Sequence, residues 1–423
     1  MRADTIVALS SGSLPAAIAV VRMSGPEAPA IAQRIAGPLP APRTASLRVL
    51  RDPVDDSAID EALLLYFPGP DTATGENIIE FQCHGSNAVV RKLIGVMTSV
   101  EQCRLAEPGE FTRRALENGR IDLTAAEGLG DLLAAETEAQ RRSALRIARG
   151  GLHDELAGLL DRLVDLSARL EAAIDYVGDE EETGGQDEAV QAELASIRAR
   201  LDAMLARPSI EPLREGVRVV IGGPTNAGKS SLINRLAGSS RVIVSDIHGT
   251  TRDLVEVPVS IAGIPVTLVD TAGIRHSDDT VEMIGIERAE EAQRNADILL
   301  WLGDKEDAPE HDRLILVSSK SDVAPASEGL AVSSVTGEGI DVLLQRIAAE
   351  AAKVVPASDE IGLTDWQSDT LGVVRETLDV TSDDIAILAD SVRAARVDVG
   401  RLLGSGNIDD VLDRLFGRFC LGK

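Results

Sequence analysis

The sequence has few cysteines, no long apolar run and too few basic residues to balance its acidic ones. Cys83, Cys103 and Cys420 are the cysteines among 423 residues, too few for a disulfide framework and without zinc-finger spacing. No apolar run approaches the roughly 20 residues that span a bilayer, and the N-terminus lacks a basic flank followed by an apolar segment. These absences argue against a disulfide-rich secreted protein and against a membrane protein. They predict a protein of the reducing cytoplasm.

Positive charge is also scarce. The chain carries 42 Lys and Arg against 69 Asp and Glu, a formal charge of −27. The acidic excess falls mainly on residues 116–212 and 356–423. Such a surface repels nucleic acid over most of its area, so a basic partner is expected if RNA is bound.

What the chain does contain is a change of pattern along its length, which at roughly 150 residues per domain suggests about three domains. Residues 1–115 read as mixed α/β, with apolar strands near residues 17–22 and 62–67. Residues 213–355 alternate short apolar strands with helices, which is typical of a parallel sheet.

Residues 116–212 and 356–423 show helical periodicity on either side of that α/β segment. Apolar residues at steps of three and four predict one packed helix face, formed by Leu152, Leu156, Leu159, Leu163, Leu166, Leu170 and Ile174. The expected fold is therefore a multidomain α/β plus α protein. Helical sequence on both sides of the α/β segment predicts an α/β domain inserted into a helical domain. Such an insertion requires only that the two ends of the inserted domain lie close together at the surface. An α+β domain precedes both.

A phosphate-binding loop is predicted at residues 223–230. The sequence Gly-Pro-Thr-Asn-Ala-Gly-Lys-Ser follows a strand and precedes a helix, the context that a P-loop requires. Backbone N–H groups can surround phosphate oxygens, Lys229 supplies a cation, and the Ser230 hydroxyl can bind Mg²⁺.

Two further segments supply the parts of a switch that senses the terminal phosphate. Asp270-Thr-Ala-Gly273 ends a strand, where the carboxylate can hold the Mg²⁺ shell and Gly273 can turn its N–H to the phosphate. Upstream, residues 249–253 read Gly-Thr-Thr-Arg-Asp and offer a hydroxyl for the metal. Together they indicate a nucleotide-dependent switch.

Base choice is predicted at residues 319–322, Ser-Lys-Ser-Asp, after another strand. Asp322 can accept both guanine N–H groups, which adenine does not offer. GTPases usually have Asn where Ser319 stands, so one base contact is weakened or replaced. Residues 333–337 are placed like a second base-contacting loop.

The group that orients the attacking water is left open by these motifs. Ile274 occupies the position where Ras has its Gln, and it has no polar atom. The candidates between residues 277 and 290 are Asp278, Asp279, Glu282 and Glu287.

In their order along the chain, these segments resemble the bacterial tRNA-modification GTPases of the MnmE (TrmE) family. The similarity also includes DTIVAL, AIAVVRMSGP, TGENIIEFQCHG, EPGEFTRRALENGRIDLTAAEG, IHGTTRD, VEMIGIERAEE and the terminal FCLGK. The family implies a folate-binding and dimerising domain at residues 1–115 and a helical domain at residues 116–212 and 356–423. It also implies a Ras-like G domain at residues 213–355.

The same resemblance implies a GTPase activated by K⁺, and it singles out Glu282 as the water-positioning carboxylate. Ser230 and Thr251 would hold Mg²⁺. The K⁺ ligands would be Asn226, Ser245, Ile247 and Thr250. The implied nucleotide contacts are Asn226, Ala227, Gly228, Lys229, Ser230, Ser231, Ser245, Asp246, Ile247, His248, Gly249, Thr250, Thr251, Asp270, Thr271, Ala272, Gly273, Lys320 and Asp322.

A reduced folate such as 5-formyltetrahydrofolate is implied as a further ligand, held by Arg22, Glu80, Arg120 and Lys423. Arg and Lys can pair with its anionic tail, and Glu80 can accept from the donor edge of a pterin ring. The implied partners are a second copy of the chain, a flavoprotein of the MnmG family in a heterotetramer, and tRNA.

The expected function is therefore a GTPase that adds an aminomethyl or carboxymethylaminomethyl group at carbon 5 of a wobble uridine. The alternatives are a ribosome-assembly GTPase and a non-enzymatic GTP-dependent switch, neither of which has reason to bind folate. Four departures from the family pattern are Thr225 before the P-loop Asn, Ser319, a connection of only 12 residues at Leu302–Arg313, and the lack of the family's Pro-Gly run at Ser10–Leu14.

Overall fold

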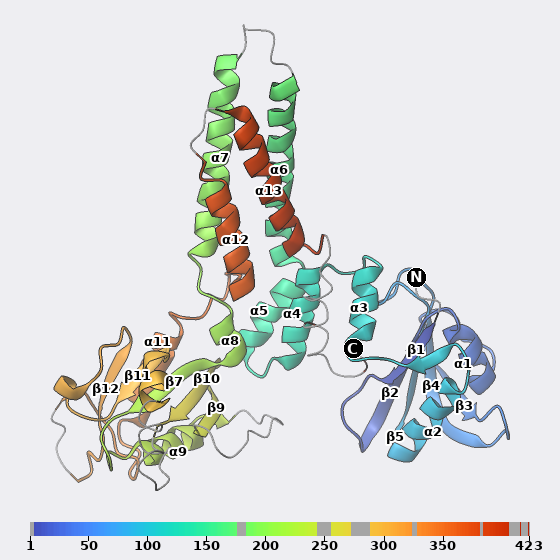
Figure 1. Ribbon diagram of the computed structural model, residues 1–423. Helices are drawn as coiled ribbons and strands as arrows, with labels where there is room; N and C mark the ends of the chain where they lie inside the picture. Colours follow the sequence, from blue (N-terminus) through green and yellow to red (C-terminus); the bar gives the residue numbers. More distant parts are fainter. Residues whose placement is uncertain are drawn as a thin grey trace. The chain divides into compact units, whose positions relative to one another are not determined.

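The structure is a computed structural model that describes residues 4–175, 183–242, 255–271, 288–323, 328–380, 384–405, 415 and 422. It divides into two compact units, residues 1–130 with 403–423 and residues 131–402, which are coloured along the chain in Figure 1. Each unit is described by itself. Within the described ranges, no helix is long and apolar enough to cross a membrane.

The first unit is built on a six-stranded sheet in the order β3-β4-β5-β2-β1-β6. Its outermost strand β6 runs parallel to β1, whereas the other neighbours are antiparallel. The strands are β1 (Thr5–Leu9), β2 (Ala16–Ser24), β3 (Ser46–Arg51), β4 (Ala58–Phe67), β5 (Ile78–Gly85) and β6 (Cys103–Leu105).

Helices α1 (Ala28–Ala36) and α2 (Asn87–Thr98) cover one face of this sheet. Their apolar residues pack with alternate strand residues, including Val21, Met23 and Phe81, in one buried core. Because successive side chains of a strand point to opposite faces, the residues between them project from the other face. Arg22 and Glu80 are therefore on the face that α1 and α2 do not cover. Helices α3 (Glu110–Glu117) and α4 (Leu123–Ala134) follow the sheet.

The helical part of the second unit is assembled from two segments far apart in the sequence. Helix α6 (Gly151–Asp175) packs with α13 (Ile385–Leu402), and α7 (Thr183–Leu205) packs with α12 (Asp365–Thr377), as Figure 1 shows. Helix α5 (Glu138–Ala148) precedes them. The six predicted leucines of α6 are buried, but Ile174 is 39% exposed. The packed stripe therefore ends one turn earlier than its spacing predicts.

The α/β domain is inserted through two adjacent chain segments, as predicted. The Ile210 N–H donates to the Leu363 carbonyl at 3.0 Å, and the Ser209 hydroxyl lies 3.1 Å from an Asp365 carboxylate oxygen. The short helix α8 (Glu211–Glu215) then leads into the domain. Neighbouring ends let the helical domain close around the insertion without a break in its packing.

The inserted domain has a seven-stranded sheet in the order β13-β12-β11-β7-β10-β9-β8. The strands from β13 to β10 in this order are parallel. Strand β9 pairs antiparallel with β10, and β8 pairs antiparallel with β9. The strands of this sheet are β7 (Val217–Gly222), β8 (Arg241–Val242), β9 (Val255–Ile261), β10 (Ile264–Asp270), β11 (Ile298–Trp301), β12 (Leu314–Ser318) and β13 (Leu330–Ala331). Helix α11 (Ile340–Ala351) closes the domain.

The short connection between β11 and β12 has no crossover α-helix. Within these described residues, a single 3-10 turn at Lys305–Asp307 joins the two parallel neighbours. Parallel strands usually need a longer crossover, so 12 residues leave room for a loop only.

Candidate nucleotide site and a second polar site

The P-loop connects the buried strand β7 to helix α9 (Lys229–Ser239). Gly223 adopts φ +133°, and a Cβ there would lie 2.5 Å from the Leu302 carbonyl oxygen, so only glycine fits. Gly228 precedes the helix in the left-handed conformation, with φ 94°. The loop thus aims the first N–H groups of α9 at the edge where the parallel strands end. Such a helix start binds anions.

Lys229 reaches back across the P-loop. Its Nζ donates to the carbonyls of Gly223 at 2.7 Å and Pro224 at 2.8 Å. These bonds hold the ammonium at the mouth of the loop. Ser230 and Ser231 follow it in the first turn of α9.

Strand β10 brings Asp270 to the same edge. It pairs in parallel with β7, and Asp270 stands opposite Ile221. The Asp270 residue is 6% exposed, and the next residue, Thr271, donates its hydroxyl to the Ile221 carbonyl at 2.8 Å. A buried carboxylate beside the P-loop is suited to ordering the ligands of a divalent cation.

The loop after β12 is hydrogen-bonded directly to the P-loop. The Ser319 hydroxyl donates to the Ala227 carbonyl at 2.6 Å, and Lys320 Nζ donates to the Asn226 carbonyl at 2.8 Å. Lys320 and Asn226 both have left-handed backbones, with φ 61° and 62°. Asn tolerates that conformation better than Lys does. The two hydrogen bonds hold the base loop, residues 319–322, and the P-loop in this register.

Asp322 is oriented by a buried serine of the second base loop. The Ser333 hydroxyl donates to Asp322 Oδ1 at 2.6 Å and accepts the backbone N–H groups of Val335 and Thr336 at 3.2 and 3.1 Å. Ser333 is completely buried. The sequence pattern indicated this loop as a base contact, but not that Ser333 positions the carboxylate.

The structure therefore brings together, at one sheet edge, the predicted residues of the P-loop, Asp270, Thr271, Lys320 and Asp322. The other predicted nucleotide and metal contacts lie outside the described residues: Ser245, Asp246, Ile247, His248, Gly249, Thr250, Thr251, Ala272 and Gly273. The proposed catalytic Glu282 and the folate contact Lys423 also lie outside them.

In the first unit, two of the predicted folate contacts are direct partners. Arg22 on β2 stands opposite Glu80 on β5, and its guanidinium lies 2.8 and 2.9 Å from Glu80 Oε1. The guanidinium carbon is also 5.8 Å from the centre of the Phe111 ring. Both charged side chains are mostly buried, so their ionic contact is better shielded from solvent than a surface pair.

Arg120 has a different partner, since its guanidinium lies 3.3 Å from the Asp71 carboxylate. Near the end of the chain, the Gly422 carbonyl accepts the Ser10 hydroxyl at 2.8 Å. Gly422 has φ +93°, and a Cβ there would lie 2.1 Å from the Leu9 carbonyl oxygen. One residue of the C-terminal motif thus packs against the end of β1.

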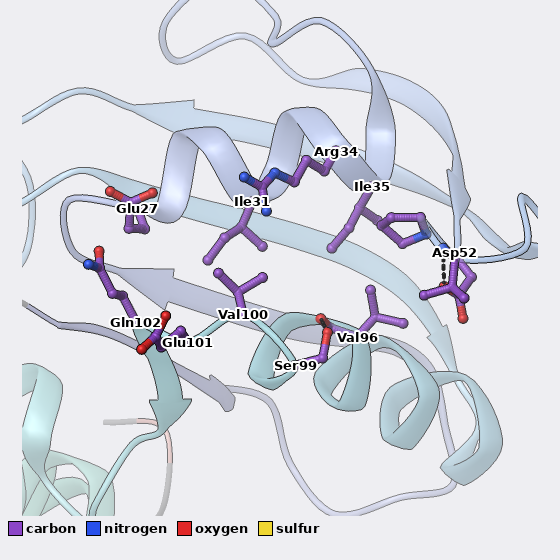
Figure 2. A pocket seen from close by; sticks show the side chains of 12 residues that line it. Glu27, Ile31, Arg34, Ile35, Asp52, Val96, Ser99, Val100, Glu101 and Gln102 are labelled. Atoms are coloured by element: carbon purple, nitrogen blue, oxygen red, sulfur yellow. Dashed lines mark hydrogen bonds between the residues drawn. The ribbon is translucent and has the colours of Figure 1, made fainter.

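A pocket of the first unit lies away from these residues, between α1, α2 and the loop after β3. Its volume is about 430 Å³. Figure 2 shows apolar side chains on its floor and charged ones at its rim. Among the residues that the structure describes, Arg22, Glu80 and Arg120 do not line it. The apolar floor consists of Ile31, Ile35, Val96 and Val100.

Comparisons with known proteins cover nearly the whole chain. The model of the GTP-binding protein TrmE N-terminus matches residues 5–120, and that of the MnmE helical domain matches residues 123–420. A tRNA modification GTPase MnmE from Erythrobacter litoralis is 44% identical over 427 residues, 99% of this chain and 100% of the relative. Its counterpart from Rhizorhabdus wittichii is 46% identical over 426 residues, 99% and 97% of the two chains. That from Zymomonas mobilis is 42% identical over 435 residues, 99% and 100%.

Proposed function

Because the chain belongs to the MnmE (TrmE) family and is a GTPase of tRNA modification, we propose that its two units divide one reaction between them. The second unit hydrolyses GTP and drives a conformational cycle. The first unit binds a reduced folate, the source of a one-carbon unit. With a flavoprotein of the MnmG family, the homodimer adds an aminomethyl or carboxymethylaminomethyl group at carbon 5 of a wobble uridine in cytoplasmic tRNA.

In the GTPase half, the backbone N–H groups of residues 226–231 and the Lys229 ammonium bind the phosphates. Ser230 and Thr251 would hold Mg²⁺, with Asp270 ordering its shell, and hydroxyl and carboxylate oxygens suit that ion. When bound, Mg²⁺ offsets charge on the phosphate oxygens. Glu282 orients the attacking water.

K⁺ is proposed as a second cation, with Asn226 as the ligand that lies within the described residues. The side-chain amide oxygen of Asn226 is a ligand at the P-loop of the kind that hard cations such as K⁺ prefer. The left-handed backbone of Asn226 is a separate reason for Asn there, because Asn tolerates that conformation better than most residues. A test of K⁺ must therefore keep the backbone while removing the amide.

The observation that carries the folate half is the Arg22–Glu80 pair on the sheet face that α1 and α2 leave uncovered. Arg22 fixes the direction of the Glu80 carboxylate, so that the carboxylate can accept N–H groups of a pterin ring. Arg120 and Lys423 would then take the anionic tail. In this proposal Arg22 supports Glu80 as well as contacting the ligand.

The folate assignment is tested by calorimetry of 5-formyltetrahydrofolate binding to the full chain. Glu80→Gln should weaken binding roughly tenfold or more, because a charge-assisted hydrogen bond is lost. Glu61→Gln is the matched control, an exposed Glu on the neighbouring strand β4. GTP hydrolysis should be normal in both variants. Equal folate binding by Glu80→Gln and the wild type would refute the assignment.

The role of the C-terminal motif can be tested with a single substitution instead of a deletion. Gly422→Ala places a Cβ against the Leu9 carbonyl and must displace this part of the tail. If Lys423 contacts folate, the variant binds folate more weakly and still hydrolyses GTP. Gly238→Ala is the control, because a Cβ there meets nothing within 4 Å. Unchanged folate affinity in Gly422→Ala would remove the tail from the site.

The complete reaction is tested by mass spectrometry of tRNA nucleosides from a strain that lacks this gene. The wild-type gene should restore the modified uridine, whereas Lys229→Ala and Glu80→Gln should not. Lys353→Ala serves as a control, since Lys353 is exposed and pairs with Glu350. If Glu80→Gln restores the modification fully, folate binding at this position is not required.

A further inference from the structure

We propose that this site recognises guanine through its Watson–Crick edge alone, without a side-chain contact to N7. The inference rests on the proposed function and on the prediction from the sequence that Lys320 and Asp322 contact the guanine nucleotide. It concerns Ser319, the residue that stands where GTPases usually have Asn.

The first step is that Ser319 is already bonded to the P-loop. Its hydroxyl lies 2.6 Å from the Ala227 carbonyl, and the adjacent Lys320 reaches the preceding carbonyl, that of Asn226, at 2.8 Å. Two successive residues of one loop therefore hold two successive carbonyls of the other. A contact pair of this kind fixes the distance between the base loop and the phosphate loop.

The second step is a count of donors. A serine hydroxyl has one hydrogen to donate, whereas an asparagine amide has two. A carbonyl oxygen can only accept, so the Ser319 hydrogen points to Ala227. Guanine N7 is also purely an acceptor. Asn at this position can donate hydrogen bonds to the carbonyl and to N7 at the same time, but Ser can donate to only one of them.

The third step is that recognition of the other edge of the base is intact. Ser333 accepts two backbone N–H groups and directs its own hydrogen to Asp322. An ionised carboxylate can accept about four hydrogen bonds, so one bond from Ser333 leaves it able to accept both guanine N–H groups. Guanine is thus distinguished from adenine without N7.

The consequence is a defined class of ligands. Guanine nucleotides should bind equally well whether the base carries N7 or a C–H group in its place. Ser319 acts as a positioning residue: it contributes to affinity through the P-loop and not through the base.

The experiment compares GTP with 7-deaza-GTP, in which C–H replaces N7, by calorimetry with Mg²⁺ and the full chain. The wild type should bind the two nucleotides within about twofold of each other. Ser319→Ala should weaken both by the same factor, about fivefold for one hydrogen bond. Ser319→Asn supplies the second donor and should prefer GTP by about fivefold.

A wild-type preference for GTP of about fivefold or more would overturn the proposal, because N7 would then be read. A Ser319→Ala protein that binds both nucleotides as the wild type does would also overturn it, since the hydroxyl would not hold the P-loop. The proposal would also be overturned if Ser319→Asn bound GTP and 7-deaza-GTP with equal affinity. Lys229→Ala separates these outcomes from failure of the nucleotide site itself, because it should abolish binding of both nucleotides.

Discussion

Replacing Glu110 by Gln tests whether a buried ionic cluster stabilises the first unit. Glu110 is 2% exposed at the start of α3. Arg104 donates to both of its oxygens at 2.6 and 2.8 Å, and Arg114 and the Glu107 N–H donate at 3.1 and 2.9 Å. Burial disfavours the charged form, but the hydrogen bonds from Arg104, Glu107 and Arg114 outweigh it and lower the pKa of Glu110 to about 2.

The size of the effect follows from that pKa. A fall from 4.5 to about 2 corresponds to roughly 3 kcal/mol of stability at neutral pH. Removing one partner of a buried ion pair typically costs about 3–5 kcal/mol, which agrees. Because the folded pKa is the lower one, the contribution is complete above the unfolded pKa of 4.5 and is lost as the pH falls toward 2. At pH 3 about half of it should remain.

The assay is amide hydrogen exchange followed by mass spectrometry of the full chain, read on peptides of β1 and α3. Glu110→Gln should lower their opening free energy by about 3 kcal/mol at pH 7, and by about half as much at pH 3. Both tryptophans, Trp301 and Trp366, lie in the second unit, so their fluorescence should not change. This separates a local effect from general unfolding.

Glu138→Gln provides the control for burial. Hydrogen bonds from Arg141 and Arg142 also lower the pKa of Glu138 to about 2, but its side chain is 49% exposed. Water screens such a pair, so exchange in α5 should change little. The reasoning is refuted if Glu110→Gln leaves exchange at pH 7 unaltered, or if its effect is as large at pH 3 as at pH 7.

Three further predictions concern GTP turnover and base choice. GTP hydrolysis should be faster in K⁺ than in Na⁺ at equal ionic strength. The variant Asn226→Gly keeps the left-handed backbone and should remove this difference in rate. Equal wild-type rates in both salts would argue against a K⁺ site. Glu282→Ala should slow single-turnover hydrolysis by on the order of 100-fold while GTP affinity is retained, because a water-orienting group acts mainly in the transition state. A wild-type rate would argue against Glu282 as the water-orienting group. Asp322→Asn should shift preference from GTP toward xanthosine triphosphate in competition binding, since the amide reverses one donor-acceptor match, and an unchanged preference would mean a different base site.

Local patterns in the sequence were sufficient to predict the main elements and the strand, loop and helix of the P-loop. The P-loop spacing depends on a contiguous strand, loop and helix, so its prediction needed no distant contact. The same holds for the leucines of α6, whose spacing places them on one helix face. Ile174 continues that spacing but is exposed, because burial depends on which helix lies opposite and not on periodicity alone.

Contacts between distant residues were decided by the tertiary structure. Ser319 and Ala227 are 92 residues apart, and parallel pairing of β7, β11 and β12 brings their loops to one edge. Arg22 and Glu80 are 58 residues apart and meet through strand register. The sequence alone determined which chemical groups are available, because these depend on residue type. Which donor bonds to which acceptor depends on the topology of the chain. Only the tertiary structure therefore determined that the Ser319 hydroxyl donates its single hydrogen to the Ala227 carbonyl of the P-loop.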